Sequence, residues 1–214
     1  MPLNARANNP ADDPAVDHLL YGAPALDEGM TRIERLLGAR PARGGRHPSY
    51  GTCNALLSLG PTCYLEVIAP DPGLPVPARG IGFGLQGVTT PRLVTWALRH
   101  ATIEAAAERA ALGPVEAGRR ERADGTVLAW RLSDPYEERM GGTIPFLIDW
   151  GDTPHPAAAA PSAGRLMELR IEHPAPLRVR STLEELGIEI EVARADVPRL
   201  VAIIEAAGRI VELA

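Results

Sequence analysis

Two polar residues stand inside two apolar, strand-like runs of this chain. The run 16–21 carries His18, and the run 64–68 carries Glu66. Burying a polar side chain in an apolar strand costs free energy unless a hydrogen-bond or charge partner compensates it. Each of these two side chains is therefore expected to face a site that holds such a partner. Between the runs the pattern predicts a helix over 25–37, ended by Gly38, and then a hairpin. The order strand, helix, strands is the main constraint on the fold.

The hairpin has strands over 52–59 and 62–68, joined at a Gly-Pro turn. If Leu59 pairs with Thr62, Cys53 lies on the same face as Glu66 and Asn54 on the opposite face. Cys53 and Cys63 then point to opposite sides, and two cysteines make no disulfide framework. This cysteine usage predicts a reducing, cytoplasmic location.

The same order of elements recurs in a second copy and, in incomplete or altered form, in a third segment, although residue identity barely supports a repeat. The second copy has a predicted strand over 81–86, a helix from Thr89-Thr90-Pro91 to about Arg109, a hairpin around Asp124-Gly125 and a last strand over 144–150. The third has a strand, a helix and a strand, then a helix over 198–207 and a final strand. The predicted division is a disordered arm, a first module, a proline-rich linker, a second module and a C-terminal extension that resembles a partial third module: 1–15, 16–70, 71–80, 81–156 and 157–214.

Charge and hydropathy exclude several classes of protein. The formal net charge is −5, which argues against binding nucleic acid through phosphate neutralisation. No apolar stretch is long enough to span a membrane. Residues 1–14 lack the apolar core of a secretory signal. A globular protein with neither nucleic acid nor membrane as partner is expected.

The motifs in order resemble a known family. The Asp-His-Leu-Leu opening at 17–20, the Tyr-Leu-Glu-Val-Ile strand at 64–68 and the segment 144–151 (IPFLIDWG) together resemble the glyoxalase-like branch of the vicinal oxygen chelate superfamily. The resemblance covers about 16–156. It implies an α+β fold in which paired βαβββ modules form a curved, mainly antiparallel eight-stranded sheet around a cavity, here followed by the C-terminal extension.

The resemblance also implies a metal site. His18, Glu66 and Asp149 match positions that ligate a divalent ion in this family, with Zn, Ni, Mn or Fe as candidates. The fourth ligand should lie within 82–86, but no ligand stands opposite His18, and Gln86 is displaced by about one pleat repeat. The ligand set is therefore incomplete. Without metal, Glu66 and Asp149 are candidates for acid and base.

Other residues are candidates for the cavity wall: Cys53, Gln86, Trp150 and His155. The alternatives are a buried small residue for Cys53 and a solvent-exposed linker for the loop that holds Trp150 and His155. The segment 82–87 matches G-x-G-x-x-G, but the flanking elements do not alternate as a dinucleotide fold requires, so no nucleotide is expected.

The resemblance implies an enzyme of the isomerase, lyase or dioxygenase-related type that acts on a small oxygen-rich substrate between the modules, with or without metal. The alternative is a protein of the same fold that binds or sequesters a small molecule without turnover, and the missing fourth ligand favours it. Residues 157–214 are a candidate surface for a homodimer.

Overall fold

The computed structural model describes residues 14–121, 127–136 and 139–214 of the chain. The predicted turn at Asp124-Gly125 and nearly all of the predicted arm lie outside the described residues. The first repeat contains β1 (Ala15–Gly22), α1 (Leu26–Leu37), β2 (Ala42–His47), β3 (Thr52–Ser58) and β4 (Tyr64–Pro70). The second contains β5 (Arg92–Arg99), α2 (Ile103–Arg109), β6 (Val115–Glu121), β7 (Val127–Ser133) and β8 (Phe146–Asp149). The rest of the chain contains a 3-10 turn η1 (Pro156–Ala158), β9 (Arg165–His173), α3 (Pro176–Glu185), β10 (Glu191–Arg194), β11 (Arg199–Ala206) and β12 (Arg209–Leu213).

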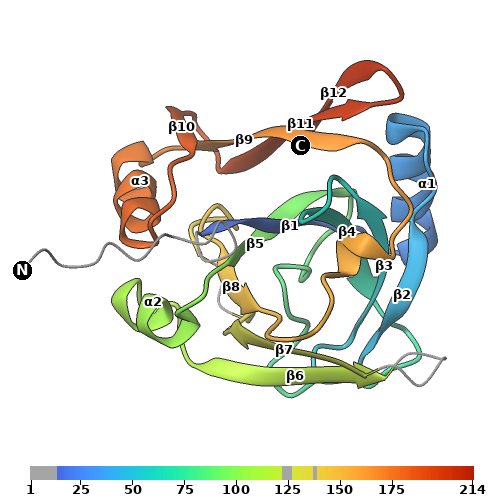
Figure 1. Cartoon of the computed structure of the whole chain (residues 1–214), viewed down its shortest axis with the longest axis horizontal. Helices are drawn as coiled ribbons and strands as arrows, with labels where there is room; N and C mark the ends of the chain where they lie inside the picture. The colour runs from blue at the N-terminus through green and yellow to red at the C-terminus, as the bar shows by residue number, and fades with distance from the viewer. Residues whose placement is uncertain (1–13, 122–126, 137–138) are drawn as a thin grey trace, which may run out of the picture.

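The two repeats share one eight-stranded sheet in the order β2-β3-β4-β1-β5-β8-β7-β6. The first strand of each repeat pairs in parallel with its own last strand, and β1 and β5 meet antiparallel at the centre. Figure 1 shows the sheet curling until the edge strands β2 and β6 approach each other, with α1 and α2 on its outer side. The predicted α+β class and the curved, mainly antiparallel sheet are confirmed.

The helix α1 follows from its apolar spacing. Leu26, Met30, Ile33 and Leu37 are buried and lie on one face, as residues three or four apart do in a helix. Gly38 ends the helix in the left-handed conformation, and its N–H donates to the Glu34 carbonyl. The buried face packs on the outer side of the first-repeat strands, which leaves their inner side free for a site.

The start of the second repeat differs from the sequence prediction. Residues 81–86 are not a strand, because Phe83, Gly84 and Gly87 have positive φ values of 62°, 67° and 77°. The predicted helix from Pro91 to Arg109 is also wrong: β5 begins at Arg92, and only Ile103–Arg109 is helical. The six residues 93–98 are all buried, so the run is apolar on both faces. Such a run shows neither the alternation of apolar and polar residues that indicates a strand nor the spacing of three or four residues that indicates a helix.

The C-terminal part forms a second sheet in the order β10-β9-β11-β12. The helix predicted over 198–207 is wrong, because Arg199–Ala206 is β11 and pairs with β9 and β12. The chain order of a strand, a helix and three strands is that of the modules. The order of the strands within the sheet differs from that of the modules. In the first repeat the first strand, β1, lies beside the last strand, β4, whereas in the C-terminal sheet the first strand, β9, lies between the second and third strands, β10 and β11. Leu200 and Ala202 of β11 share a core with Trp96 and Leu98 of β5, so this sheet covers the outer face of the first.

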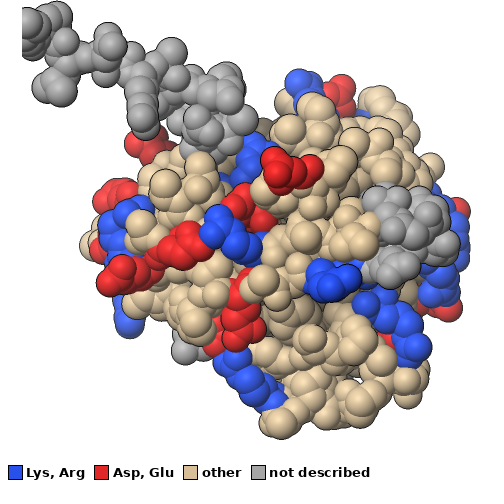
Figure 2. Space-filling view, turned by 60° about the horizontal axis from the view of Figure 1, so that its bottom comes forward, with Lys and Arg blue, Asp and Glu red and all other residues tan. Residues whose placement is uncertain are grey.

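The surface carries charges of both signs. Arginines and acidic residues are interspersed over the face seen in Figure 2, and pairs such as Arg165 with Glu205 and Arg199 with Glu172 lie on the C-terminal sheet. No helix of the described ranges is long and apolar enough to cross a membrane.

A close approach at Gly142 holds the segment before β8 against β5. A Cβ at Gly142, where φ is 81°, would lie 1.8 Å from the Val94 carbonyl oxygen, whereas a Cβ at Gly87, where φ is 77°, would meet nothing within 4 Å. We expect Gly87→Ala to cost about 1–2 kcal/mol through backbone strain alone. Gly142→Ala should cost about 1–3 kcal/mol more. Urea unfolding of both variants measures the difference, and equal losses would contradict the close approach.

Candidate active site

The register between β3 and β4 decides which side chains stand beside Glu66. Glu66 pairs with Leu56, and the Leu59 N–H donates to the Cys63 carbonyl at 2.9 Å. The predicted pairing of Leu59 with Thr62 is therefore wrong by one residue, because the loop holds three residues rather than two. A one-residue slip exchanges the faces of a strand. Asn54 thus lies on the face of Glu66, and Cys53 lies on the other.

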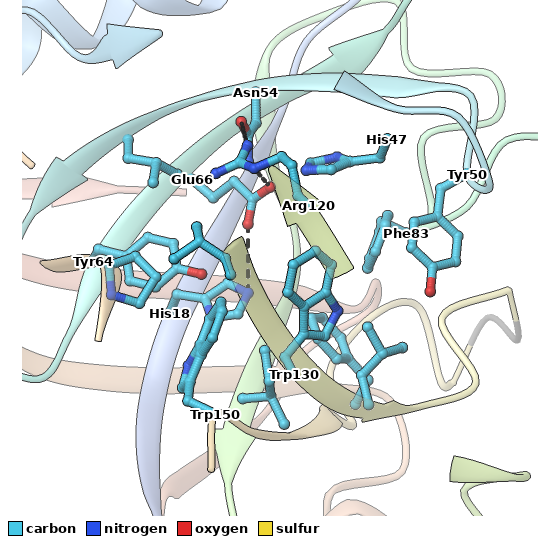
Figure 3. Close-up of a pocket in the computed structure, with 16 residues that line it drawn as sticks. His18, His47, Tyr50, Asn54, Tyr64, Glu66, Phe83, Arg120, Trp130 and Trp150 are labelled. Atoms are coloured by element: carbon cyan, nitrogen blue, oxygen red, sulfur yellow. Dashed lines mark hydrogen bonds and ion pairs between the residues drawn. The ribbon is translucent and has the colours of Figure 1, made fainter. Parts of the chain in front are cut away.

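The inner face of the curved sheet encloses a cavity (Figure 3). Its lining comes from both repeats and from the loops that follow β2, β4 and β8: His18, His47, Tyr50, Asn54, Leu56, Tyr64, Glu66, Phe83, Arg120, Leu128, Trp130, Leu132, Phe146, Ile148, Trp150 and Pro156. The polar groups gather on the strands of the first repeat, together with Arg120 from β6. The opposite wall, from β7 and β8, is apolar and aromatic.

Glu66 lies at the polar end of the cavity and is 7% exposed. Its Oε1 accepts a hydrogen bond from Asn54 Nδ2 at 2.7 Å, and its Oε2 lies 3.5 Å from His18 Nε2. The two residues meet because β1 and β4 run in parallel with His18 opposite Tyr64, so Glu66 is two residues further along the same face. Figure 3 shows the Glu66 carboxylate pointing at the His18 ring.

Asp17 holds the other side of the His18 ring. The pairing of β1 with β5 shifts between Val16 and His18, and Asp17 is fully buried at this irregularity. Its Oδ1 lies 2.7 Å from His18 Nδ1, and its Oδ2 lies 3.1 Å from His155 Nε2. Trp150 Nε1 donates to both oxygens, at 3.2 and 3.3 Å. Burial alone would raise the pKa of Asp17, but the hydrogen bonds from His155 and His18 outweigh it and leave the pKa well below its usual value.

These contacts place a hydrogen on His18 Nδ1 and on His155 Nε2. An ionised Asp17 only accepts hydrogen bonds, so His18 Nδ1 and His155 Nε2 donate to it. His155 Nδ1 accepts from the Ala157 N–H, which makes that ring the neutral tautomer. His18 Nε2 therefore faces the Glu66 carboxylate with either a lone pair or a second proton. Two acceptors repel at this range, so one proton between His18 and Glu66 satisfies the pair.

Neighbouring rings and an arginine complete the polar end. Tyr64 stacks on His18 with ring centroids 4.4 Å apart, and burial raises the pKa of Tyr64 well above its usual value. The Arg120 side chain passes over strand β2 at Gly45, and its Nη1 lies 3.5 Å from Asn54 Oδ1. A Cβ at Gly45 would lie 2.3 Å from that nitrogen, so glycine is what lets the guanidinium pass. Burial lowers the pKa of His47 and favours its neutral form.

Two of the candidate wall residues lie at the centre of this arrangement. Trp150 lines the cavity and donates to Asp17, and His155 donates to Asp17 from the loop after β8. Two others lie elsewhere. Cys53 borders a hollow beside β2 and the loop after β4, and Gln86 borders one beside the start of β5. Cys53 and Cys63 are free thiols.

Asp149 is not brought together with His18 and Glu66. Phe146 and Ile148 of β8 line the cavity, and Asp149 follows on the alternate face. Its carboxylate pairs with Arg131, which also contacts Glu104 of α2 on the outer side. Burial works to raise the pKa of Asp149, but the hydrogen bond and the positive charge of Arg131, together with the hydrogen bond from the Gly151 N–H, outweigh burial and lower the pKa.

The described residues do not fit a metal site of the family's kind. His18 and Glu66 offer one imidazole and one carboxylate, and Asp17 lies behind the imidazole rather than beside Glu66. In the second repeat, Ala97 and Ile148 face the cavity region instead of ligands. Within 14–121, 127–136 and 139–214, no group of three or more His, Cys, Asp or Glu side chains could hold a metal ion.

The polar end also holds residues that the sequence patterns do not mark as site residues, among them Asp17, Asn54 and Arg120. Asp17 stood beside His18 in the motif that carried the family resemblance, and that adjacency was the signal for it. Asn54 was placed on the wrong face by the register error. Arg120 belongs to a hairpin strand whose position across the cavity depends on closure of the sheet, and no local pattern marks it.

Comparisons with known proteins agree with this fold. A family model described as a glyoxalase-like domain matches residues 16–187. The crystal structure of a hypothetical protein from Staphylococcus aureus is 13% identical, with a TM-score of 0.64 over 94% of this chain and 99% of that chain. A mutant 4-hydroxymandelate synthase from Streptomyces coelicolor is 15% identical, with a TM-score of 0.49 over 94% of this chain and 62% of that chain. Methylmalonyl-CoA epimerase from Mycobacterium tuberculosis is 20% identical, with a TM-score of 0.41 over 64% of this chain and 87% of that chain. A comparison of the sequence with curated proteins gives no significant match.

The curved sheet of two βαβββ repeats, with its cavity on the inner face, defines the class of protein: a vicinal oxygen chelate fold. The chain belongs to the glyoxalase-like domain family, whose model matches more than half of its length. The match also includes β9 and α3, so it extends beyond the sequence resemblance, which ended at Pro156.

Proposed function

We propose that this protein is a small-molecule enzyme of the isomerase or lyase type, which moves a proton between carbon and oxygen of a small carbonyl substrate. The observation that carries the proposal is the row Asp17, His18 and Glu66, in which a buried carboxylate orients an imidazole toward a second carboxylate in the cavity. A carboxylate and an imidazole side by side supply a general base and a general acid.

In the proposed reaction, Glu66 accepts the proton from the carbon next to a carbonyl group. The C–H electron pair becomes a C=C bond, and the carbonyl electron pair takes a proton from His18, which gives an enol. Glu66 is then protonated and His18 neutral. Their 3.5 Å separation allows the proton to pass back from Glu66 to His18, so the pair is restored for the next turnover. The sum is movement of one proton from carbon to oxygen, with no oxidant or reductant.

The surroundings suit such a proton transfer. Asn54 Nδ2 donates to Glu66 Oε1 and holds the carboxylate in place. Asp17 stabilises the positive charge on His18 from the far side. Since His18 and Glu66 are only 2% and 7% exposed, their charges interact more strongly than they would in water.

Deuterium exchange tests the proposal without knowledge of the natural substrate. The purified protein is incubated in D₂O with pyruvate, 2-oxobutanoate or phenylpyruvate, and loss of the carbon-bound proton is followed by ¹H NMR. We expect exchange of at least one of these 2-oxo acids to be accelerated about 10²-fold or more over buffer. The acceleration should persist after treatment with EDTA, because the described residues supply acid and base without metal.

Two outcomes would overturn the proposal. Binding of these 2-oxo acids without exchange would support a sequestering protein instead. Exchange that disappears with EDTA and returns with Zn²⁺, Ni²⁺, Mn²⁺ or Fe²⁺ would show that the reaction runs through a metal and not through the acid–base pair alone.

A further inference from the structure

The aromatic residues of this chain are concentrated at the cavity. The sequence contains two Phe, three Trp and four Tyr. Six of these nine line the cavity: Tyr50, Tyr64, Phe83, Trp130, Phe146 and Trp150. Of the others, Tyr21 and Trp96 are fully buried in the core that packs on the outer face of the sheet. Aromatic side chains make up only 4% of the chain, so this gathering is not a consequence of general composition.

The rings are held at angles that suit a flat guest. Tyr50 meets Phe83 at 5.0 Å and 75°, and Phe83 meets Phe146 at 5.5 Å and 61°. Trp130 and Trp150 lie 5.8 Å apart, tilted by 58°. In an edge-to-face contact the edge of one ring meets a single face of its partner, and a flat aromatic guest can add contacts of the same kind. Figure 3 shows Trp130 and Trp150 on one side of the cavity, with Tyr50 and Phe83 beside them.

The polarity of the cavity is divided between its two sides. The wall from β7 and β8 consists of Leu128, Leu132, Phe146 and Ile148 together with the two tryptophans, and none of these is charged. The opposite end contains Glu66, His18 and the Arg120 guanidinium. Guanidinium and imidazolium groups only donate hydrogen bonds, so they match oxygen acceptors such as a carbonyl or a carboxylate.

We infer that the substrate of this site has a flat aromatic body and an oxygen-bearing end, a carbonyl or carboxylate group. The body lies among the rings of Trp130, Phe83 and Phe146, and the oxygens lie toward Arg120 and His18. The inference rests on the proposed function in taking this cavity as the substrate site. It goes further by naming the chemical class of the substrate.

Binding of two matched acids tests the aromatic part. Phenylacetate and cyclohexylacetate carry the same carboxylate on six-membered rings, and only the first ring is flat and aromatic. Stacking and edge contacts are worth about 0.5–1.5 kcal/mol per aromatic pair, which converts to a preference of about 2- to 12-fold. We expect isothermal titration calorimetry to show phenylacetate binding more tightly within this range. The uncharged 2-phenylethanol should bind about tenfold more weakly than phenylacetate, because it lacks the carboxylate for Arg120.

Two variants assign the preference to the cavity. Trp130→Leu removes a ring from the wall and should bring the ratio of the two affinities close to one. Tyr136→Leu is the matched control, because Tyr136 contacts Tyr50 from outside the lining residues, and it should keep the ratio. Circular dichroism confirms that both variants are folded.

The wild-type affinities decide the inference even if a variant fails to fold. Equal affinity for phenylacetate and cyclohexylacetate, or no binding of either, would overturn it. A preference for phenylacetate that survives in Trp130→Leu would overturn the placement of the ring. These are binding measurements, so they are distinct from failure of the proposed reaction. Tight, selective binding without proton exchange would leave the substrate class standing and remove the catalytic assignment.

Discussion

Replacing Glu66 by glutamine should lower the rate of carbon–deuterium exchange by about 10²–10⁴-fold, the usual contribution of a general base. The glutamine keeps the size of the side chain and can still accept a hydrogen bond from Asn54 through its amide oxygen, but it cannot accept the substrate proton. We expect ligand affinity to change much less than the rate. The measurement is exchange by ¹H NMR, compared with calorimetric binding of the same 2-oxo acid.

Asp149→Asn is the matched control for Glu66→Gln. Both changes replace a carboxylate by an amide on the last strand of a repeat, but Asp149 pairs with Arg131 on the outer face. We expect Asp149→Asn to keep the exchange rate within a few-fold of wild type. A loss as large as that of Glu66→Gln would contradict the acid–base site and would bring back the trio of His18, Glu66 and Asp149 that the sequence predicted.

Replacing Asp17 by asparagine should have the largest effect on stability, about 3–5 kcal/mol at neutral pH, because it removes the charge from a buried, fully paired group. Three donors converge on this carboxylate, from His18, His155 and Trp150. An amide also brings two N–H groups of its own into the same space, and these would face donors. Urea unfolding at pH 7 measures the loss. Asp152→Asn, at an exposed position in the loop after β8, should change stability by no more than about 0.5 kcal/mol.

The loss in Asp17→Asn should depend on pH in a defined direction. The folded state lowers the pKa of Asp17, so its carboxylate stabilises the fold above the unfolded pKa of about 3.9. That contribution is lost as the pH falls through the unfolded and then the folded pKa. The gap between wild type and Asp17→Asn should therefore be constant between pH 5 and 7 and should shrink below about pH 4. A gap that stays constant down to pH 2.5 would contradict an ionised, paired Asp17.

Part of the site could be predicted from local sequence. His18 and Glu66 stand out because each is polar within an apolar strand, and buried polar groups need partners. The residues of the second repeat were harder to place, because 93–98 is apolar on both faces and carries no period. The helix predicted there displaced the first strand of the repeat by about eleven residues, from Ile81 to Arg92. Gln86 was counted as a cavity residue for that reason.

The sequence by itself determined the order of elements in the first repeat and the pair His18 and Glu66, because these depend on local periodicity and on residues within two strands. The class of fold followed from the resemblance that these motifs carry. The tertiary structure alone decided what surrounds the pair. A three-residue hairpin loop set the register that brought Asn54 beside Glu66 and turned Cys53 away. Closure of the sheet carried Arg120 across β2, and the alternation of β8 placed Asp149 outside the cavity. Register and closure arise from contacts between distant segments, which a local pattern does not contain.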